Sequence, residues 1–263
     1  MDKPQAKRKR SRPRRDVALM VTCLADLMRP SVGFSAIRLL ERAGCRVTVP
    51  EQQTCCGQPA YNSGEIDAAV PVAQAVIETF EPFDYVVIPS GSCAGMLSHH
   101  YPALFEGEWR ERALALSAKT WELTRFLTEV ALLPAPKRAA LEAAVTYHDG
   151  CAGLREMGIQ QQPRQLLQEQ CGVQVQELTE NQVCCGFGGT FCARMPEISG
   201  KMADDKLNHA VASGAKVLAG GDLGCLLHLA GRAKRRGLDL EIRHIAELLA
   251  GNPKGPGIGE GRQ

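Results

Sequence analysis

Eight of the eleven cysteines fall into two matching sets, and their spacing is the feature of this sequence that points most directly to chemistry. In both sets a single cysteine is followed 32 or 33 positions later by an adjacent pair, and a last cysteine comes 37 or 40 positions after the pair. The first set is Cys23, Cys55, Cys56 and Cys93, and the second is Cys151, Cys184, Cys185 and Cys225. Repetition of this pattern indicates that the chain contains an internal duplication.

Thiolates are soft ligands that suit iron–sulfur clusters and zinc. Structural zinc usually takes its thiolates from two C-x-x-C knuckles, and this sequence has none. An adjacent pair suits a multi-iron cluster better, because neighbouring sulfurs can bind different irons. Gly57 and Gly186 follow the two pairs and permit a turn with positive φ and a close approach of the main chain. We therefore expect one or two iron–sulfur clusters, of the [4Fe-4S] type, and keep a zinc-stabilised, non-catalytic scaffold as an alternative.

Other candidate residues have a simpler interpretation. Cys45, Cys171 and Cys192 lie outside the two sets, and buried cysteine often acts as a small hydrophobic residue. His148 and Asp149 precede Cys151 and could form an acid/base pair beside a thiol. The residues directly before Cys23 include neither type, so we expect no role common to both sets. The glycines after Cys185 do not form a dinucleotide-binding loop, because Phe191 stands where a glycine or alanine is required.

Short apolar runs alternate with longer amphipathic segments, and this alternation predicts the elements that position the cysteines. The expected order in the first half is strand 17–22, helix 31–43 with Ser31 as cap and Gly44 as stop, strand 47–49, helix 63–80 with a kink or break at Pro71, and strand 85–88. In the second half it is strand 145–147, helix 163–170, strand 173–175, helix 196–212, strand 216–219 and strand 238–242. The predicted fold is α/β, with two similar halves that each contain a small, mostly parallel sheet flanked by helices.

The predicted strands explain how distant cysteines can meet. Cys23, Cys93, Cys151 and Cys225 each follow a predicted strand, and the Cys-Cys-Gly triplets follow the second strand of their halves. Open α/β sheets place their ligands at the carboxyl ends of the strands. We therefore expect each set of four thiols to surround one centre.

The domain boundaries follow from composition. Residues 109–133 show a long helical pattern that ends at the linker Pro134-Ala135-Pro136. We expect a disordered basic tail over 1–15, a first cysteine-rich half over 16–140, a second over 141–250 and a flexible tail over 251–263. Residues 1–15 hold eight of the 31 basic side chains and are interpreted as a solvated tail that binds no nucleic acid.

The chain has 263 residues, of which 44% are hydrophobic and 23% charged, and these values predict a globular protein. Its apolar runs are too short for a membrane span. Asp16 and Asp26 bracket the first apolar stretch, and no small-residue cleavage site follows it, so a secretory signal is not expected. The many dispersed cysteines favour a reducing compartment, and we expect a cytoplasmic protein.

Several longer motifs carry a resemblance to a known family. They are Thr54-Cys55-Cys56-Gly57-Gln58-Pro59-Ala60-Tyr61-Asn62, Pro89-Ser90-Gly91-Ser92-Cys93, Tyr147-His148-Asp149-Gly150-Cys151, Cys184-Cys185-Gly186-Phe187-Gly188-Gly189-Thr190-Phe191 and Gly221-Asp222-Leu223-Gly224-Cys225-Leu226. The sequence from Val17 to Leu249 resembles the lactate-utilisation protein A family, a group with the cysteine-rich CCG domain of the heterodisulfide reductase B subunit.

The resemblance implies an oxidoreductase subunit that relays electrons during oxidation of L-lactate to pyruvate. Its implied partners are a ferredoxin-like iron–sulfur subunit and a third, smaller lactate-utilisation subunit, without which we expect no activity. It also implies that each set of four cysteines holds one centre. The chain departs from heterodisulfide reductase, which ends each half in C-x-x-C, because Met96 and His228 occupy the last position here. His228 could be a fifth ligand, and a thiol/disulfide redox enzyme like heterodisulfide reductase remains an alternative.

Overall fold

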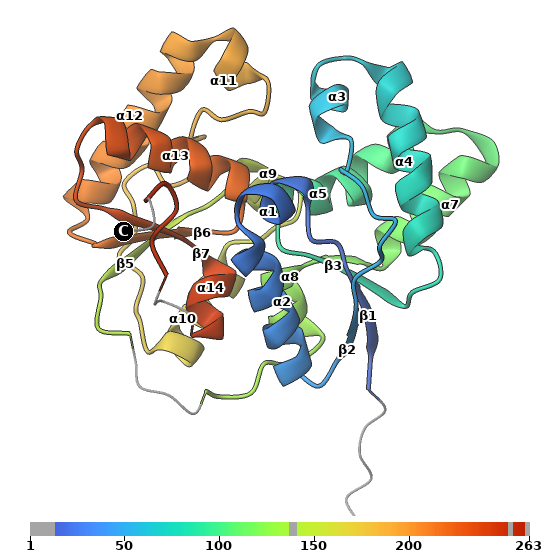
Figure 1. Cartoon of the computed structure of the whole chain (residues 1–263), viewed down its shortest axis with the longest axis horizontal. Coiled ribbons are helices and arrows are strands. Elements are labelled where there is room, and N and C mark those ends of the chain that lie inside the picture. The colour runs from blue at the N-terminus through green and yellow to red at the C-terminus, as the bar shows by residue number, and fades with distance from the viewer. Residues whose placement is uncertain (1–13, 137–140, 252–254, 261–263) are drawn as a thin grey trace, which may run out of the picture.

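The computed structural model describes residues 14–136, 141–251 and 255–260. The chain forms two small parallel sheets with helices packed around them (Figure 1). The first sheet lies in the first half of the sequence and the second sheet in the second half. This arrangement confirms the predicted α/β fold with two similar halves.

The first sheet has four parallel strands in the order β2-β1-β3-β4. Their bounds are β1 (Asp16–Leu19), β2 (Arg46–Thr48), β3 (Tyr85–Ile88) and β4 (Thr120–Glu122). The two central strands, β1 and β3, are almost fully apolar and buried, as expected for strands covered on both faces. Helices cover this sheet: α1 (Cys23–Met28), α2 (Pro30–Arg42), α3 (Gln58–Asn62), α4 (Ile66–Phe80), α5 (Gly91–Gly95), the π-helix η1 (Met96–His100), α6 (Tyr101–Leu104), α7 (Gly107–Ala118) and α8 (Leu123–Glu129).

The second sheet has three parallel strands in the order β5-β6-β7. Their bounds are β5 (Val145–His148), β6 (Val217–Gly220) and β7 (Glu241–His244). The helices of this half are α9 (Cys151–Arg155), α10 (Gln161–Cys171), α11 (Phe191–Arg194), α12 (Pro196–Ala212), α13 (Leu223–Arg235) and α14 (Ile245–Ala250). The predicted helix over 196–212 is confirmed at both ends.

Several predicted elements differ from the structure. The stretch 109–133, expected to be one helix, contains strand β4 between α7 and α8. The predicted strand 173–175 is not formed, and this part of the chain meets β5 only through single bonds such as the one from the Gln176 N–H to the Val145 carbonyl (2.9 Å). Ser31 lies inside α2 and does not cap it, because its hydroxyl donates to the Glu247 carboxylate (2.6 Å). Pro71 is accommodated within α4, which starts later than expected.

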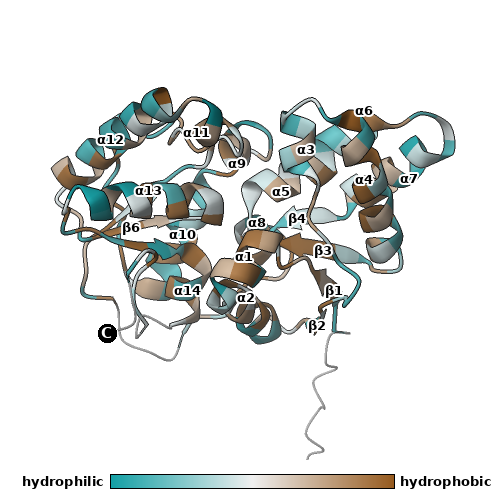
Figure 2. Cartoon of the chain, turned by 45° about the horizontal axis from the view of Figure 1, so that its top comes forward, coloured by the Kyte–Doolittle hydropathy of each residue, from teal (hydrophilic) through white to brown (hydrophobic). Residues whose placement is uncertain are grey.

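The two halves share a hydrophobic core. One buried cluster contains Val17 and Leu39 from the first half together with Val145 and Ile245 from the second. Helix α14 packs along α2, and Figure 2 shows hydrophobic turns of both helices in the middle of the molecule. Arg29 strengthens this contact through an ion pair with Glu247 (2.9 Å). The two halves therefore stabilise each other and are not independent domains joined by a linker.

Parts of the expected tails and of the expected boundary between the halves lie outside the described residues, whereas residues 255–260 are described. Residues 1–13 of the expected basic tail, and residues 137–140 at the expected boundary, lie outside the described residues. Within the segment expected to be a flexible tail, residues 255–260 pack on the second half: Ile258 is buried, and its N–H donates to the Ile242 carbonyl (2.8 Å). No helix among the described residues has the length and apolar character needed to cross a membrane.

Candidate thiol centres

The first four cysteines come together at the carboxyl edge of the first sheet. Cys23 begins α1 directly after β1, Cys93 lies in α5 after β3, and the adjacent pair lies in the loop between β2 and α3. The sulfurs form two close pairs, with 3.6 Å between Cys23 Sγ and Cys55 Sγ and 3.4 Å between Cys56 Sγ and Cys93 Sγ. Cys56 is buried, and the other three are half-buried. We call these four residues the first thiol group.

Electrostatic coupling joins the pairs of the first thiol group. The hydrogen bond from the Cys23 thiol, and after it the neighbouring Cys56 thiol, lower the pKa of Cys55. The pKa of Cys23 is raised, first by its hydrogen bond to Cys55 and then by burial. The pKa of Cys56 is raised by its neighbours Cys55 and Cys93 and then by burial. Four sulfurs this close cannot all be thiolates without a compensating positive charge. The donor set therefore fits a cationic metal centre.

The second thiol group consists of Cys151, Cys184, Cys185 and Cys225, and it repeats this arrangement. Cys151 begins α9 directly after β5, Cys225 lies in α13 after β6, and the adjacent pair lies in the loop before α11. The four thiols shift one another's pKa: Cys151 and then Cys185 lower the pKa of Cys184, and Cys184 and then Cys225 raise the pKa of Cys185. The second cysteine of the pair is again the buried one. The structure thus brings together all four members of each predicted set.

The glycine after each pair forms the turn that the sequence predicted. Gly57 has φ +80° and Gly186 has φ +85°. The Gly186 N–H donates to Cys184 Sγ (3.3 Å), and a Cβ at this position would lie 2.6 Å from the Ser199 carbonyl oxygen. Gly186 therefore allows both a left-handed backbone and a close contact with α12, which only glycine combines.

The cysteines outside the two groups serve other contacts. Cys45 and Cys171 are buried in the core that the two halves share, which agrees with their interpretation as small hydrophobic residues. Cys192 is half-buried, and its thiol donates to the Gly189 carbonyl (3.2 Å). His228 lies on α13 with Cys225, but its Nε2 is 3.2 Å from Ser199 Oγ. Met96, the corresponding residue of the first half, is fully buried in the core.

His148 is the residue near the second thiol group whose position the sequence did not reveal. It ends β5, is 1% exposed, and has a ring nitrogen within 4.8 Å of the sulfurs of both Cys185 and Cys225. The acid/base pair that His148 and Asp149 could have formed is absent, because Arg164 binds the Asp149 carboxylate (2.8 Å) and neither His148 nitrogen has a hydrogen-bond partner among the described residues. A histidine at the strand end three residues before a ligand-type cysteine was the available signal.

The two thiol groups lie on either side of one contact between the halves. Helices α5 and α9, which carry Cys93 and Cys151, pack against each other, and a Cβ on Gly91 would lie 2.6 Å from Gly153 Cα. Figure 1 shows both helices in the centre of the molecule. Asp222 fastens this contact, because its Oδ1 accepts hydrogen bonds from Ser90 Oγ (2.6 Å) and Ser92 Oγ (2.8 Å) of the other half.

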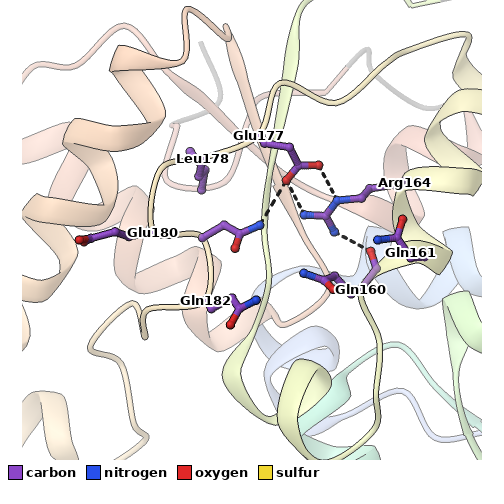
Figure 3. Close-up of a pocket in the computed structure, with 8 residues that line it drawn as sticks. Gln160, Gln161, Arg164, Glu177, Leu178, Glu180 and Gln182 are labelled. Atoms are coloured by element: carbon purple, nitrogen blue, oxygen red, sulfur yellow. Dashed lines mark hydrogen bonds and ion pairs between the residues drawn. The ribbon is translucent and has the colours of Figure 1, made fainter.

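Two pockets are candidate binding sites for a small acid. A pocket of about 550 Å³ surrounds Arg164, but this guanidinium is already paired with Asp149 (2.8 Å) and Glu177 (2.6 Å), as Figure 3 shows for Glu177. A pocket of about 400 Å³ reaches Cys23 and Cys55, and its charged lining residues are both acidic, Asp26 and Glu51. Neither pocket offers an unpaired cation to an organic carboxylate.

Comparison with known proteins places this architecture in a family. Residues 17–98 and 145–230 each match the model of the cysteine-rich CCG domain. Lactate utilization protein A of Halalkalibacterium halodurans is 48% identical over 235 residues, which cover 89% of this chain and 96% of that protein. Lactate utilization protein A of Bacillus thuringiensis is 45% identical over 235 residues, covering 89% of this chain and 98% of its own length.

One more relative and one solved structure are similar to this chain. Lactate utilization protein A 2 of Bacillus cereus is 43% identical over 236 residues, covering 89% of this chain and 97% of the relative. A solved structure of a putative Asp/Glu racemase from Yersinia pestis aligns over 90% of this chain and 96% of the racemase chain with 9% identity. Its TM-score of 0.36 is too low to indicate a shared fold. By its paired domains and its relatives, this chain belongs to the cysteine-rich CCG domain family, among proteins related to lactate utilization protein A.

Proposed function

We propose that this chain is an iron–sulfur subunit that relays electrons when L-lactate is oxidised to pyruvate. The observation that carries the proposal is the presence of two equivalently built thiol groups, each with its sulfurs gathered at the carboxyl edge of a parallel sheet. The relatives named lactate utilization protein A supply the metabolic context. Clusters of the [4Fe-4S] type bound there supply one-electron transfer.

The chain's own residues have three tasks in this proposal. Cys23, Cys55, Cys56 and Cys93 hold the first centre, and Cys151, Cys184, Cys185 and Cys225 hold the second. The glycine turns bring main-chain N–H groups toward the sulfurs, as Gly186 does for Cys184, and such hydrogen bonds tune the potential of a cluster. The packing of α5 on α9 keeps the two centres at a fixed separation.

We propose that partner subunits bind the lactate. The acidic lining of the pocket at Cys23 and Cys55 disfavours a carboxylate, and Arg164 is neutralised by its own carboxylates. The same pocket is bordered by Leu27, which is 77% exposed, and by Val49, which is 38% exposed. This apolar rim beside two cysteines supports docking of an electron-transfer partner, for which we propose a ferredoxin-like iron–sulfur subunit, with a third lactate-utilisation subunit completing the complex.

The test is anaerobic purification followed by analysis of iron, zinc and acid-labile sulfide. We expect iron and sulfide in equal amounts and no stoichiometric zinc. Lactate-dependent dye reduction is then measured with the chain alone and with its partner subunits, and we expect activity only in the complex. Stoichiometric zinc without sulfide would instead identify a non-catalytic scaffold.

The pocket at the first thiol group favours one second candidate function. A disulfide substrate that enters this pocket would reach Cys23 and Cys55, which line it. The chain would then act as a thiol/disulfide redox enzyme like heterodisulfide reductase. Disulfide-dependent oxidation of a reduced dye by the purified chain, without lactate or partners, would favour this function over the lactate relay.

A further inference from the structure

His148 is a buried histidine without a hydrogen-bond partner among the described residues, which is rare in folded proteins. It is 1% exposed, and neither Nδ1 nor Nε2 has a hydrogen-bond partner among the described residues. Leaving a buried polar group unpaired is destabilising, and nearly all such groups in native proteins are hydrogen-bonded. The ring instead faces the sulfurs of Cys185 and Cys225, so its nitrogens are available to an ion that these sulfurs hold.

The surroundings of the ring identify the kind of partner. His148, Cys185 and Cys225 form a group of three ligand-type side chains whose donor atoms all lie within 4.8 Å of one another. Imidazole nitrogen and thiolate sulfur are both ligands of iron, and they occur together in iron–sulfur centres. His228, the other histidine near this group, is already bonded to Ser199 Oγ (3.2 Å).

The first half has no counterpart of this histidine. Met20 stands three residues before Cys23, as His148 stands three residues before Cys151, and Met20 is fully buried in the core. Among the described residues, a three-donor group of this kind is found at the second thiol group and not at the first. The duplicated halves thus offer different ligand chemistry.

We infer that His148 is a nitrogen ligand of the second centre, which is therefore held by imidazole and thiolate together, whereas the first centre is held by thiolates alone. This inference rests on the proposed iron–sulfur function and deepens it. A neutral imidazole adds no negative charge, and histidine ligation raises the reduction potential of iron–sulfur centres. If both thiol groups hold clusters, a higher potential at the second would favour electron transfer from the first group to the second.

The experiment uses full-length protein purified anaerobically from cells fed ¹⁵N-histidine, reduced and studied by electron–nuclear double resonance. We expect hyperfine coupling from the labelled nitrogen in the wild type, its loss in His148→Met, and its retention in the control His228→Gln. Cluster signals without nitrogen coupling in the wild type, or coupling that persists in His148→Met, would overturn the inference. If His148→Met does not fold, wild-type coupling that persists in His228→Gln still supports the inference, and absence of coupling from the wild type overturns it.

A redox titration gives the second readout. His148→Cys supplies a thiolate in place of imidazole, and we expect it to shift the higher of two midpoint potentials downward while the lower one stays unchanged. Unchanged potentials in His148→Cys would contradict the inference and leave the proposed function intact. Absence of iron and sulfide from the wild type would overturn both.

Discussion

The two halves build the same thiol group on different supports. In each, the first cysteine begins a helix after the first strand, and the second cysteine of the pair is the buried one. The first half adds a fourth strand and an open pocket that reaches Cys23 and Cys55. The second half has three strands and places the His148 ring against its sulfurs. Duplication has kept the ligand positions while the surroundings diverged.

Ligand substitutions test most strongly whether the halves act alike. We expect Cys55→Ser to abolish the first centre and Cys184→Ser the second, so that each variant loses about half of the bound iron. Because each centre is needed for the relay, both should lose lactate-dependent dye reduction by the complex. The matched controls Cys45→Ala and Cys171→Ala lie in the shared core, and we expect them to keep both centres. Full iron content in both serine variants would refute two-centre binding.

The glycine turns should respond unequally to alanine. In Gly186→Ala the new Cβ meets the Ser199 carbonyl oxygen at 2.6 Å in addition to a left-handed φ, and we expect a loss of about 3 kcal/mol or more. In Gly57→Ala the nearest atom is Val72 Cγ1 at 3.4 Å, so we expect only the backbone cost of about 1–2 kcal/mol. Urea unfolding measures both. Equal losses would show that the contact with α12 is not rigid.

The last strand of each half ends in a buried residue that caps the next helix. Burial shifts the pKa of these two residues in opposite directions. Glu122 caps α8, and burial raises its pKa to about 7, whereas His244 caps α14, and burial lowers its pKa. In the unfolded chain Glu122 loses its proton at a lower pH than in the folded protein. Its contribution to the free energy of unfolding should therefore fall by about 3 kcal/mol as pH rises from 4.5 to 7.

Glu122→Gln should remove this fall, and the free energy of unfolding measured by urea titration at several pH values checks it. Burial of neutral His244 opposes the effect, because its contribution to stability grows as pH rises toward 6.5. The variant curve should therefore rise more steeply over this range than the wild-type curve. Parallel curves would show that Glu122 titrates normally in the fold.

The smallest effect concerns the contact between the halves. Asp222→Ala removes the acceptor of the Ser90 and Ser92 hydroxyls, and we expect a loss of about 2 kcal/mol. The control Asp205→Ala removes an exposed ion pair with Lys201 and should cost about 0.5 kcal/mol or less. Thermal unfolding of both variants checks this difference, and equal shifts would mean that Asp222 does not join the halves.

Much of this fold follows from local patterns. Strands β1 and β3 were predicted because buried parallel strands have nearly continuous apolar sequences, and their parallel order explains why cysteines far apart in sequence meet. Strand β4 was missed because its three residues are too few to show a period, and its last residue, Glu122, is a buried acid. His148 was not predicted as a metal ligand, because only the folded structure shows that its ring has no hydrogen-bond partner.

Mössbauer spectroscopy of anaerobically purified protein enriched in ⁵⁷Fe tests the central claim most directly. The account predicts iron in sulfide-bridged clusters with sulfur-rich coordination, present in the wild type and reduced by about half in Cys55→Ser and in Cys184→Ser. A spectrum of isolated iron bound by oxygen and nitrogen, or protein that holds zinc and no inorganic sulfide, would contradict it.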